Sequence, residues 1–173
     1  VENSTESLLK LNNDISSSLD LIDKENNSFL NINSDPISES EIIIENEDLI
    51  LKFNSKGGLL VEAQLKKFTD YKGDPLYMVK DGNQNISLNF STLNGKSVNT
   101  ANYNFNPIVN KGSEATTLTM VLSVSENQFI NFEYIIPKKG FMMDFSINST
   151  GFRSLIDDKK SITLNWDLKA FRQ

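Results

Sequence analysis

The sequence predicts an all-β, antiparallel sandwich. From Glu41 onward, short runs alternate between apolar and polar residues, which is typical of strands that bury one face. Turn-forming pairs separate the runs, among them Gly57-Gly58, Asn94-Gly95 and Lys139-Gly140. No long helical pattern interrupts residues 41–173. Seven or more strands without helices favour two packed antiparallel sheets over a parallel sheet.

The expected strands follow in chain order. Their apolar alternations span residues 42–44, 49–53, 59–65, 86–90, 118–124, 130–136, 143–147 and 162–168. Each is expected to bury one face, because alternate side chains of a strand point the same way. The third run is expected to place on one face Leu59, Val61, Ala63 and Leu65. The last run is expected to bury Ile162, Leu164, Trp166 and Leu168. Lys80-Asp81-Gly82-Asn83 is expected to be a hairpin turn.

Residues 1–40 differ from the rest, since they are rich in Asn, Ser and acidic residues. Apolar residues recur there at helical spacing, at Leu8, Leu11, Ile15, Leu19 and Ile22. One interpretation is an amphipathic helix that docks on a partner. The other, which we favour, is a helical or extended tether, or a helix packed on its own domain. The predicted domains are therefore an N-terminal tether, residues 1–40, and a sandwich domain, residues 41–173, which we expect to be truncated at its C-terminus.

Composition excludes several classes of function. The net charge of −6 and the pI of about 4.7 argue against nucleic acid and against electrostatic binding to anionic lipid. No apolar run approaches the length of a membrane helix, so the fragment itself is expected to be soluble. The absence of Cys and His removes zinc-thiolate sites, the commonest general base and the Ser-His-Asp triad. We therefore expect no catalytic residue, no metal ligand, no cofactor and no enzymatic activity.

The remaining candidate chemistry has structural explanations. Asp157-Asp158 is expected to lie in a solvated loop, because adjacent carboxylates do not face each other across a cleft. Gly57 and Gly58 are expected to supply positive φ in a structural turn, because a strand follows them where a phosphate loop needs a helix. Phe129 is the candidate exposed aromatic residue for binding, because the alternation places it beside Asn131, on the face of the strand opposite to Phe132 and Tyr134. Five aromatic residues form either a platform that stacks on sugar or peptide or part of the core, and we favour the core because aromatic residues in strands are more often buried: Trp166, Tyr103, Phe105, Phe129 and Tyr134.

Three ordered stretches carry a resemblance to a known family. The first runs from Glu47-Asp48-Leu49 through Lys56-Gly57-Gly58 to Leu65-Lys66-Lys67-Phe68. The second comprises residues 132–145, around Pro137-Lys138-Lys139-Gly140, and the third comprises residues 165–173, which begin Asn165-Trp166-Asp167. Together they resemble the periplasmic, P1-type domain of a YidC/OxaA-type membrane-protein insertase of the Bacteroidetes kind. Residues 1–40 match only the variable tether that follows the first membrane helix of that family.

The resemblance implies a β-supersandwich like that of galactose mutarotase. It implies a bacterial inner-membrane parent protein with this domain in the periplasm, acting as a non-catalytic scaffold for membrane-protein insertion. The implied partners are Sec translocon subunits (SecDF and SecYEG) and nascent membrane proteins. The alternative is a secreted β-sandwich module that binds carbohydrate or peptide, and its mark would be an exposed aromatic in a concave groove.

Overall fold

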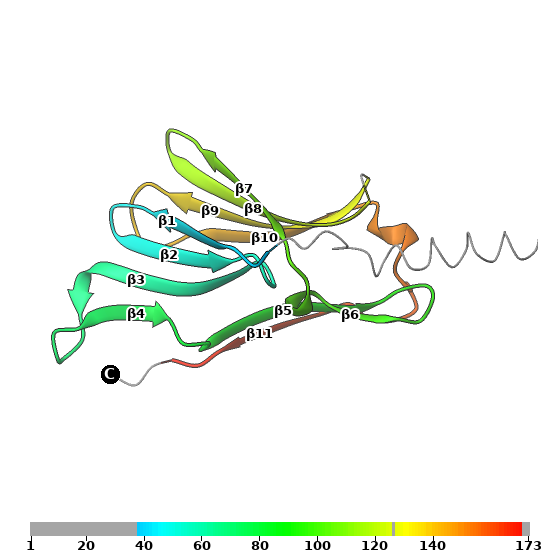
Figure 1. The fold of residues 1–173 in the computed structure, drawn as a ribbon, viewed down its shortest axis with the longest axis horizontal. Coiled ribbons are helices and arrows are strands. Elements are labelled where there is room, and N and C mark those ends of the chain that lie inside the picture. Colours follow the sequence, from blue (N-terminus) through cyan, green and yellow to red (C-terminus); the bar gives the residue numbers. More distant parts are fainter. Residues whose placement is uncertain (1–37, 126, 171–173) are drawn as a thin grey trace, which may run out of the picture.

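The fold is all-β, as the sequence predicts. The computed structural model describes residues 38–125 and 127–170, and in these ranges it contains antiparallel strands, two short 3₁₀ helices and no α-helix (Figure 1). The predicted tether, residues 1–40, lies almost entirely outside the described residues, including its apolar stripe. The strands are β1 (Glu41–Glu45), β2 (Leu49–Asn54), β3 (Leu59–Thr69), β4 (Pro75–Val79), β5 (Gln84–Ser91), β6 (Ser97–Asn99), β7 (Asn106–Lys111), β8 (Ala115–Ser125), β9 (Gln128–Pro137), β10 (Asp144–Thr150) and β11 (Thr163–Leu168).

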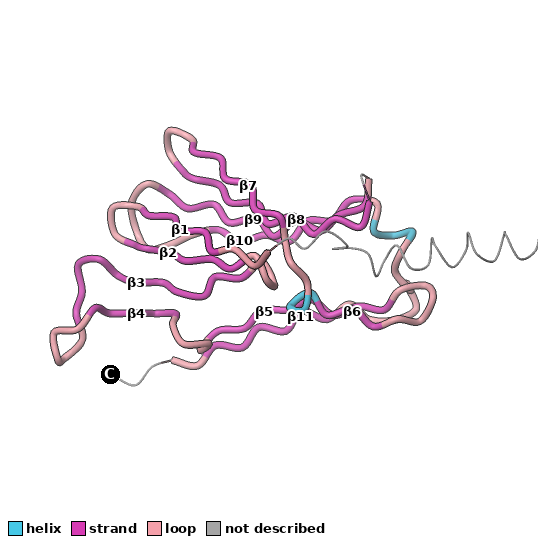
Figure 2. Tube along the Cα trace, in the orientation of Figure 1, coloured by secondary structure: helices cyan, strands magenta, loops and turns pink. Residues whose placement is uncertain are grey.

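The strands form three sheets. The first sheet has the order β1-β2-β3-β4 and the second β10-β9-β8-β7, so each consists of consecutive strands. The third sheet has the order β11-β5-β6 and joins strands that are far apart in the sequence. The short 3₁₀ helix η1 (Thr100–Asn102) leads from β6 towards β7, and η2 (Phe152–Ser154) follows β10. The tube in Figure 2 follows this path from one sheet to the next.

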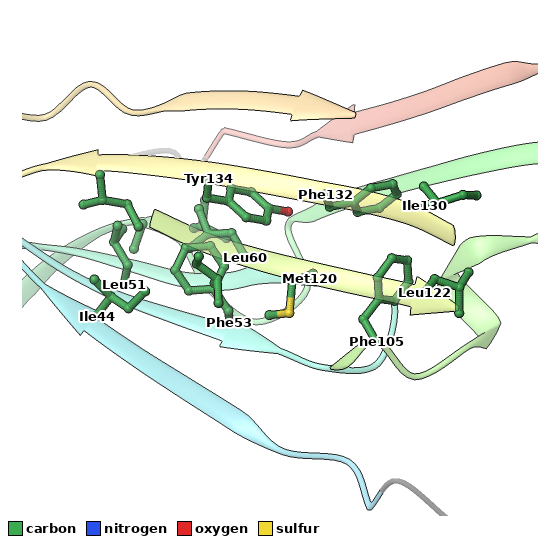
Figure 3. Close-up of a cluster of buried hydrophobic side chains, with 14 of the residues drawn as sticks. Ile44, Leu51, Phe53, Leu60, Phe105, Met120, Leu122, Ile130, Phe132 and Tyr134 are labelled. Carbon is green, nitrogen blue, oxygen red and sulfur yellow. The ribbon is translucent and has the colours of Figure 1, made fainter. Parts of the chain in front are cut away.

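The first and second sheets enclose the main core. Figure 3 shows side chains of β1 and β2 pointing towards those of β8 and β9. In β2 the side chains of Leu49, Leu51 and Phe53 are buried, whereas those between them are half-buried. In β9 the alternation is equally regular from Phe129 to Pro137. This period of two is what the sequence predicts for strands with one inner face.

An aromatic cluster fills the centre of this core. The Phe53 and Tyr134 rings lie 4.8 Å apart at an interplanar angle of 57°. Tyr134 also stacks on Phe145 at 4.8 Å, and Phe105 packs on Phe132 at 4.9 Å. Aromatic pairs at these separations stabilise by about 0.5–1.5 kcal/mol beyond their area burial. The cluster links the first sheet to the second and to the segment before β7.

The turn between β2 and β3 is inserted into this aromatic cluster. Gly57 and Gly58 both have positive φ, 75° and 65°, a conformation that favours glycine. A Cβ atom on Gly58 would lie 3.1 Å from the Phe105 ring. The buried Tyr134 hydroxyl donates a hydrogen bond to the Gly58 carbonyl oxygen at 2.8 Å. The backbone of this turn also pairs with the segment before β7, since the Phe105 N–H donates to the Ser55 carbonyl at 2.8 Å.

The third sheet joins the same core through its β5–β6 side. Phe90 of β5 and Val98 of β6 are buried, and Phe90 meets Phe152 of η2 edge to face at 5.2 Å. The Leu88 N–H of β5 donates to the Thr100 hydroxyl at 2.9 Å, which ties the sheet to η1. The β11 side of the sheet lies at its outer edge (Figure 1).

The alternation of apolar and polar residues does not predict three of the observed strands, β4, β6 and β7. The prediction of one hairpin turn is also wrong. β4 contains consecutive apolar residues, β6 is only three residues long, and β7 contains Pro107 and leaves Ile108 exposed, so none shows a clear period of two. The turn at Lys80-Asp81-Gly82-Asn83 is not a hairpin, because β4 and β5 belong to different sheets. Asp81 and Gly82 have positive φ, so the local turn geometry is present without strand pairing.

The predicted faces of two strands are also wrong. In β3 the register shifts so that Lys52 opposes Glu62 and Phe53 opposes Leu60, which leaves Val61 as the extra residue of a β-bulge. Leu60 is buried in consequence, and Leu59 and Val61 are only half-buried. In β11 every residue is exposed, so its apolar face is not buried among the described residues. An alternation of residue types does not reveal whether a second layer covers the face.

Replacing Tyr134 by Phe tests the hydrogen bond inside the core. The variant keeps the ring and leaves the buried Gly58 carbonyl without its donor, so we expect the free energy of unfolding to fall by about 2 kcal/mol. Urea denaturation measures this change. The matched control is Tyr71→Phe, because Tyr71 is 78% exposed, and we expect no measurable effect. Equal stability losses in the two variants would contradict the role given to the Tyr134 hydroxyl.

Replacing Gly58 by Ala tests the close packing of the turn. We expect it to destabilise more than Gly82→Ala, which has a similar φ of 71° and nothing within 4 Å of the added Cβ. Both variants carry the cost of positive φ for a residue with a side chain, and only Gly58→Ala adds overpacking against Phe105, about 1–3 kcal/mol. Thermal unfolding of the two variants gives the difference. Equal thermal midpoints for the two variants would contradict this prediction, because the core would then accommodate the added methyl group at Gly58.

Candidate functional site

The described residues do not bring together a set of metal-binding side chains. Within residues 38–125 and 127–170, no group of three or more Asp, Glu, His or Cys could hold a metal ion. Asp157 lies in a turn, where its carboxylate accepts the Lys159 N–H at 3.1 Å, and Asp158 is exposed. The pair lies in a loop, as expected, but Asp157 is half-buried and pairs with Lys160 at 4.0 Å, so only Asp158 is fully solvated. The features that remain for function are a polar cluster at one end of the sandwich and two exposed apolar surfaces.

Asp48 connects the two main sheets at one end of the sandwich. Its carboxylate accepts a hydrogen bond from Lys67 Nζ at 2.6 Å and another from the Gly140 N–H at 2.8 Å. The Asp48 residue is only 6% exposed. The hydrogen bond from Lys67 and then that from Gly140 lower the pKa of Asp48 from its ordinary value of 3.8, against the opposing effect of burial. The same contact raises the pKa of Lys67 above 10.5.

Asn46 completes this connection. Its side-chain oxygen accepts the N–H groups of Asp48 and Leu49 at 2.8 and 2.7 Å, which shapes the β1–β2 turn. Its side-chain nitrogen donates to the carbonyl oxygens of Pro137 and Gly140, both at 3.0 Å. Asn46 and Asp48, with Lys67 and Gly140, are called the polar clasp below. The clasp fixes the β1–β2 turn against the β9–β10 loop.

A first apolar surface lies beside the clasp. Phe68, at the end of β3, contacts Phe141 of the β9–β10 loop with ring centroids 5.9 Å apart. Both rings are about half exposed, and Met142 is 81% exposed. Phe68, Phe141 and Met142 are called the loop-end cluster. The sequence marks Phe68 and Phe141 only as residues of two family-like stretches, because nothing in a strand-and-loop pattern shows that the end of β3 meets the β9–β10 loop.

A second apolar surface runs along β11. Ile162, Leu164, Trp166 and Leu168 are 53%, 48%, 60% and 57% exposed, and they are called the β11 row. They lie on one face of the strand, because they occur at every second position. The sequence identifies these residues but predicts them to be buried. Their exposure is a feature that only the structure reveals.

The residues singled out from sequence are distributed through the fold. Phe129 is half-buried on β9, opposite Ser123 and Thr150, and its role in binding stays a prediction. Phe105 and Tyr134 are fully buried in the core and unavailable for stacking on a ligand, whereas Trp166 is exposed. Phe105 and Tyr134 are therefore core residues, as the sequence favours, and Trp166 is the member of the set that is exposed.

A shallow hollow of about 270 Å³ lies on the third sheet. Its lining is dominated by uncharged polar residues: Asn89, Phe90, Ser91, Ser97, Val98, Asn99, Asn102, Ser161 and Thr163. A sugar site of the usual kind presents an aromatic face beside such groups. The lining aromatic, Phe90, is only 4% exposed, so the hollow offers hydrogen-bonding groups without a stacking surface.

The fold and these surfaces define an antiparallel β-sandwich domain with exposed apolar surfaces. The chain is a distant homologue of the YidC membrane protein insertases of Bacteroidetes, and the similarity is consistent with their periplasmic domain. It is 27% identical over 137 residues to the membrane protein insertase YidC of Azobacteroides pseudotrichonymphae, covering 79% of this chain and 22% of the relative. For the YidC proteins of Parabacteroides distasonis and Porphyromonas gingivalis the identities are 24% and 25%, with 75% and 79% of this chain covered.

The similarity covers only a small part of each relative. The chain spans about a fifth of the length of these curated relatives, 20% to 22%. No family model and no solved structure matches the chain. Among the described residues, no helix has the length and apolar character needed to cross a membrane.

The polar clasp predicts how stability depends on acid. A carboxylate whose pKa is lowered by folding stabilises the fold above its ordinary pKa, and the contribution is lost as the pH falls through the lowered value. We therefore expect the free energy of unfolding to fall as the pH is lowered through and below the ordinary Asp pKa of 3.8, and Asp48→Asn to flatten this dependence. Lys67→Gln should flatten it as well, because Lys67 makes the larger contribution to the shift. An unchanged slope in both variants, measured by urea denaturation, would contradict the assignment.

Proposed function

We propose that this chain is the periplasmic domain of a bacterial inner-membrane protein insertase, in which it acts as a non-catalytic scaffold. The observation that carries this proposal is the homology over 131 to 137 residues to proteins named membrane protein insertase YidC. That length includes most of the region from β1 to β11. The activity of the whole relative is assigned here only as a proposal, because the chain spans about a fifth of it.

The chemistry of the chain supports a scaffold over a catalyst. The sequence contains neither His nor Cys, so a general base near neutral pH would have to come from a strongly perturbed carboxylate or amine. Asp48, a carboxylate with a resolved shift, has a lowered pKa and is occupied by Lys67 and Gly140. Its hydrogen bonds join two sheets, which is a structural task.

The exposed surfaces support a role in contacts. Apolar side chains that are exposed in a cluster mark interaction surfaces, whereas apolar side chains that are exposed singly are common on any protein surface. In the proposed setting the partners are Sec translocon subunits and membrane proteins during their insertion. The proposed complete fold is a β-supersandwich of the galactose-mutarotase kind, of which residues 41–173 form the first part.

Deleting residues 41–173 from the full-length insertase tests the scaffold role. We expect the membrane part to fold and to insert a reporter membrane protein at a reduced rate, because a scaffold aids contacts without performing the transfer. Insertion is measured in reconstituted vesicles by protease protection of the reporter. Complete loss of insertion by a folded deletion protein would contradict the scaffold role, and so would an unchanged rate with every reporter.

A matched control distinguishes a scaffold role of the domain from a chemical role of its carboxylates. The double variant Asp157→Asn and Asp158→Asn keeps the sandwich and removes the adjacent acidic pair in the loop after β10. We expect this variant to insert the reporter at the rate of the unaltered protein. A loss as large as that caused by the deletion would assign chemistry to the acidic pair and overturn the non-catalytic proposal.

A further inference from the structure

Four turns meet at one end of the sandwich, and two of them carry exposed apolar side chains. Figure 1 shows the turns between β1 and β2, β3 and β4, and β9 and β10 at the same end of the fold. Backbone hydrogen bonds join them, because the Glu47 N–H donates to the Lys138 carbonyl at 3.1 Å and the Lys138 N–H donates to the Glu114 carbonyl, in the β7–β8 turn, at 3.0 Å. The loop-end cluster lies at this end, as does Tyr71 of the β3–β4 turn, which is 78% exposed.

The polar clasp holds the exposed rings of this cluster in place. Lys67 directly precedes Phe68, and Gly140 directly precedes Phe141. Lys67 Nζ and the Gly140 N–H both donate to the Asp48 carboxylate, at 2.6 and 2.8 Å. The two rings consequently keep their contact, with 5.9 Å between centroids, while about half of each faces solvent. An apolar projection that is fixed before binding loses little conformational freedom when it binds.

Two unpaired lysines precede the cluster in the β9–β10 loop. Lys138 and Lys139 are exposed, and neither forms an ion pair with any residue that the structure describes. A lysine side chain can place its ammonium group beside a phosphate while its methylene groups and the neighbouring residues lie in an apolar layer. Aromatic residues and lysines together are typical of protein surfaces at the boundary between lipid headgroups and acyl chains.

This end of the sandwich carries little of the chain's negative charge. Its turns and the strand ends beside them comprise residues 45–49, 66–75, 111–115 and 137–144. In these residues the acidic side chains outnumber the lysines by one, whereas the whole chain has a net charge of −6. A negatively charged bilayer would therefore repel the rest of the domain more than this end, which favours an orientation with the loop-end cluster towards the lipid.

We propose that the loop-end cluster enters the headgroup region of a phospholipid bilayer, where Lys138 and Lys139 contact lipid phosphates. This inference rests on the proposed function, which places the domain beside the inner membrane, and it deepens that function by naming the surface through which the scaffold meets the membrane. Insertion of the apolar side chains drives the contact, since a chain of this charge gains little from electrostatic binding to anionic lipid. We therefore expect zwitterionic lipid to be sufficient.

A protein partner fits this surface less well than a bilayer. Phe68, Phe141 and Met142 are 48%, 50% and 81% exposed, and together they offer roughly half of the ~800 Å² that each partner buries in a stable protein–protein interface. A bilayer needs no complementary shape, because its headgroup region adapts to the side chains that enter it. Attachment to a membrane-anchored polypeptide also raises the effective lipid concentration, so a small apolar contact is sufficient.

Fluorescence quenching by lipid-bound nitroxides tests the proposal in the full-length protein. Thr69→Cys introduces a labelling site on the exposed residue after Phe68 and leaves the cluster intact. Leu93→Cys is the matched control, because Leu93 is 65% exposed and belongs to the β5–β6 turn, which lies at the opposite end of the fold (Figure 1). Each variant, with any other cysteine replaced by serine, is labelled with an environment-sensitive fluorophore and reconstituted into phosphatidylcholine vesicles that carry headgroup nitroxides. We expect nitroxide quenching at Thr69 to exceed that at Leu93 several-fold.

Three outcomes of this measurement would overturn the proposal. Equal quenching at the two positions would show that the cluster approaches the lipid no more closely than the opposite end does. Quenching that requires anionic lipid and disappears at high salt would assign the contact to the lysines alone. Protection of the Thr69 label in native membranes without quenching in pure lipid would assign the surface to a protein partner.

Substitutions in the cluster give an independent readout. We expect Phe141→Ser with Met142→Ser to lower the quenching at Thr69 several-fold and Leu93→Ser to leave it unchanged, because only the first variant removes apolar side chains from the bilayer. Met142→Ser alone, at an 81% exposed position, should lower the quenching in part without affecting folding. Unchanged quenching in both cluster variants would contradict the insertion of the cluster.

The result is separate from that of the insertion assay. Absence of quenching at Thr69, together with slower insertion after deletion of residues 41–173, would reject the membrane contact and keep the scaffold role. Quenching at Thr69 together with an unchanged insertion rate after the deletion would reject the scaffold role and keep the membrane contact.

Discussion

The packing of Gly58 into the aromatic cluster is the constraint on which the sandwich depends. A Cβ atom at this position would lie 3.1 Å from the Phe105 ring and 3.3 Å from Met120, so a side chain fits only if these neighbours shift, and the Tyr134 hydroxyl donates to the Gly58 carbonyl. One backbone unit therefore fixes the distance between the first sheet, the second sheet and the segment before β7. Because a well-packed interior transmits small displacements, a shift at this turn would alter contacts across the whole core.

The polar clasp provides a second fixed point, at the far end of the same two sheets. The Gly58 contact relies on shape and one neutral hydrogen bond, whereas the clasp relies on a carboxylate and a lysine with opposite pKa shifts. Two attachments of different chemistry hold the layers in register along their length. Conditions that weaken one, such as acid at the clasp, leave the aromatic attachment intact.

The sequence predicts the all-β class and the inner faces of β2, β8 and β9, because in these central strands burial follows residue type. It does not predict the inner face of β3, where the bulge at Val61 exchanges the buried position. Nor does it place the loop-end cluster, since the contact between Phe68 and Phe141 joins the end of β3 to the β9–β10 loop, and their proximity depends on the whole fold. The β11 row shows the same limit, because alternation reports a strand's preference for burial and carries no information on its partner.

The arrangement of the third sheet has a consequence for the order in which the chain can fold during synthesis. The first sheet is complete once Val79 has emerged, and the second once Thr150 has emerged, because each uses consecutive strands. The third sheet pairs β5 with β11, which closes a loop over more than half of the described chain, and such non-local pairing is slow. β5 therefore waits with one edge open while the second sheet forms. A nascent chain is most exposed to misassociation in that interval.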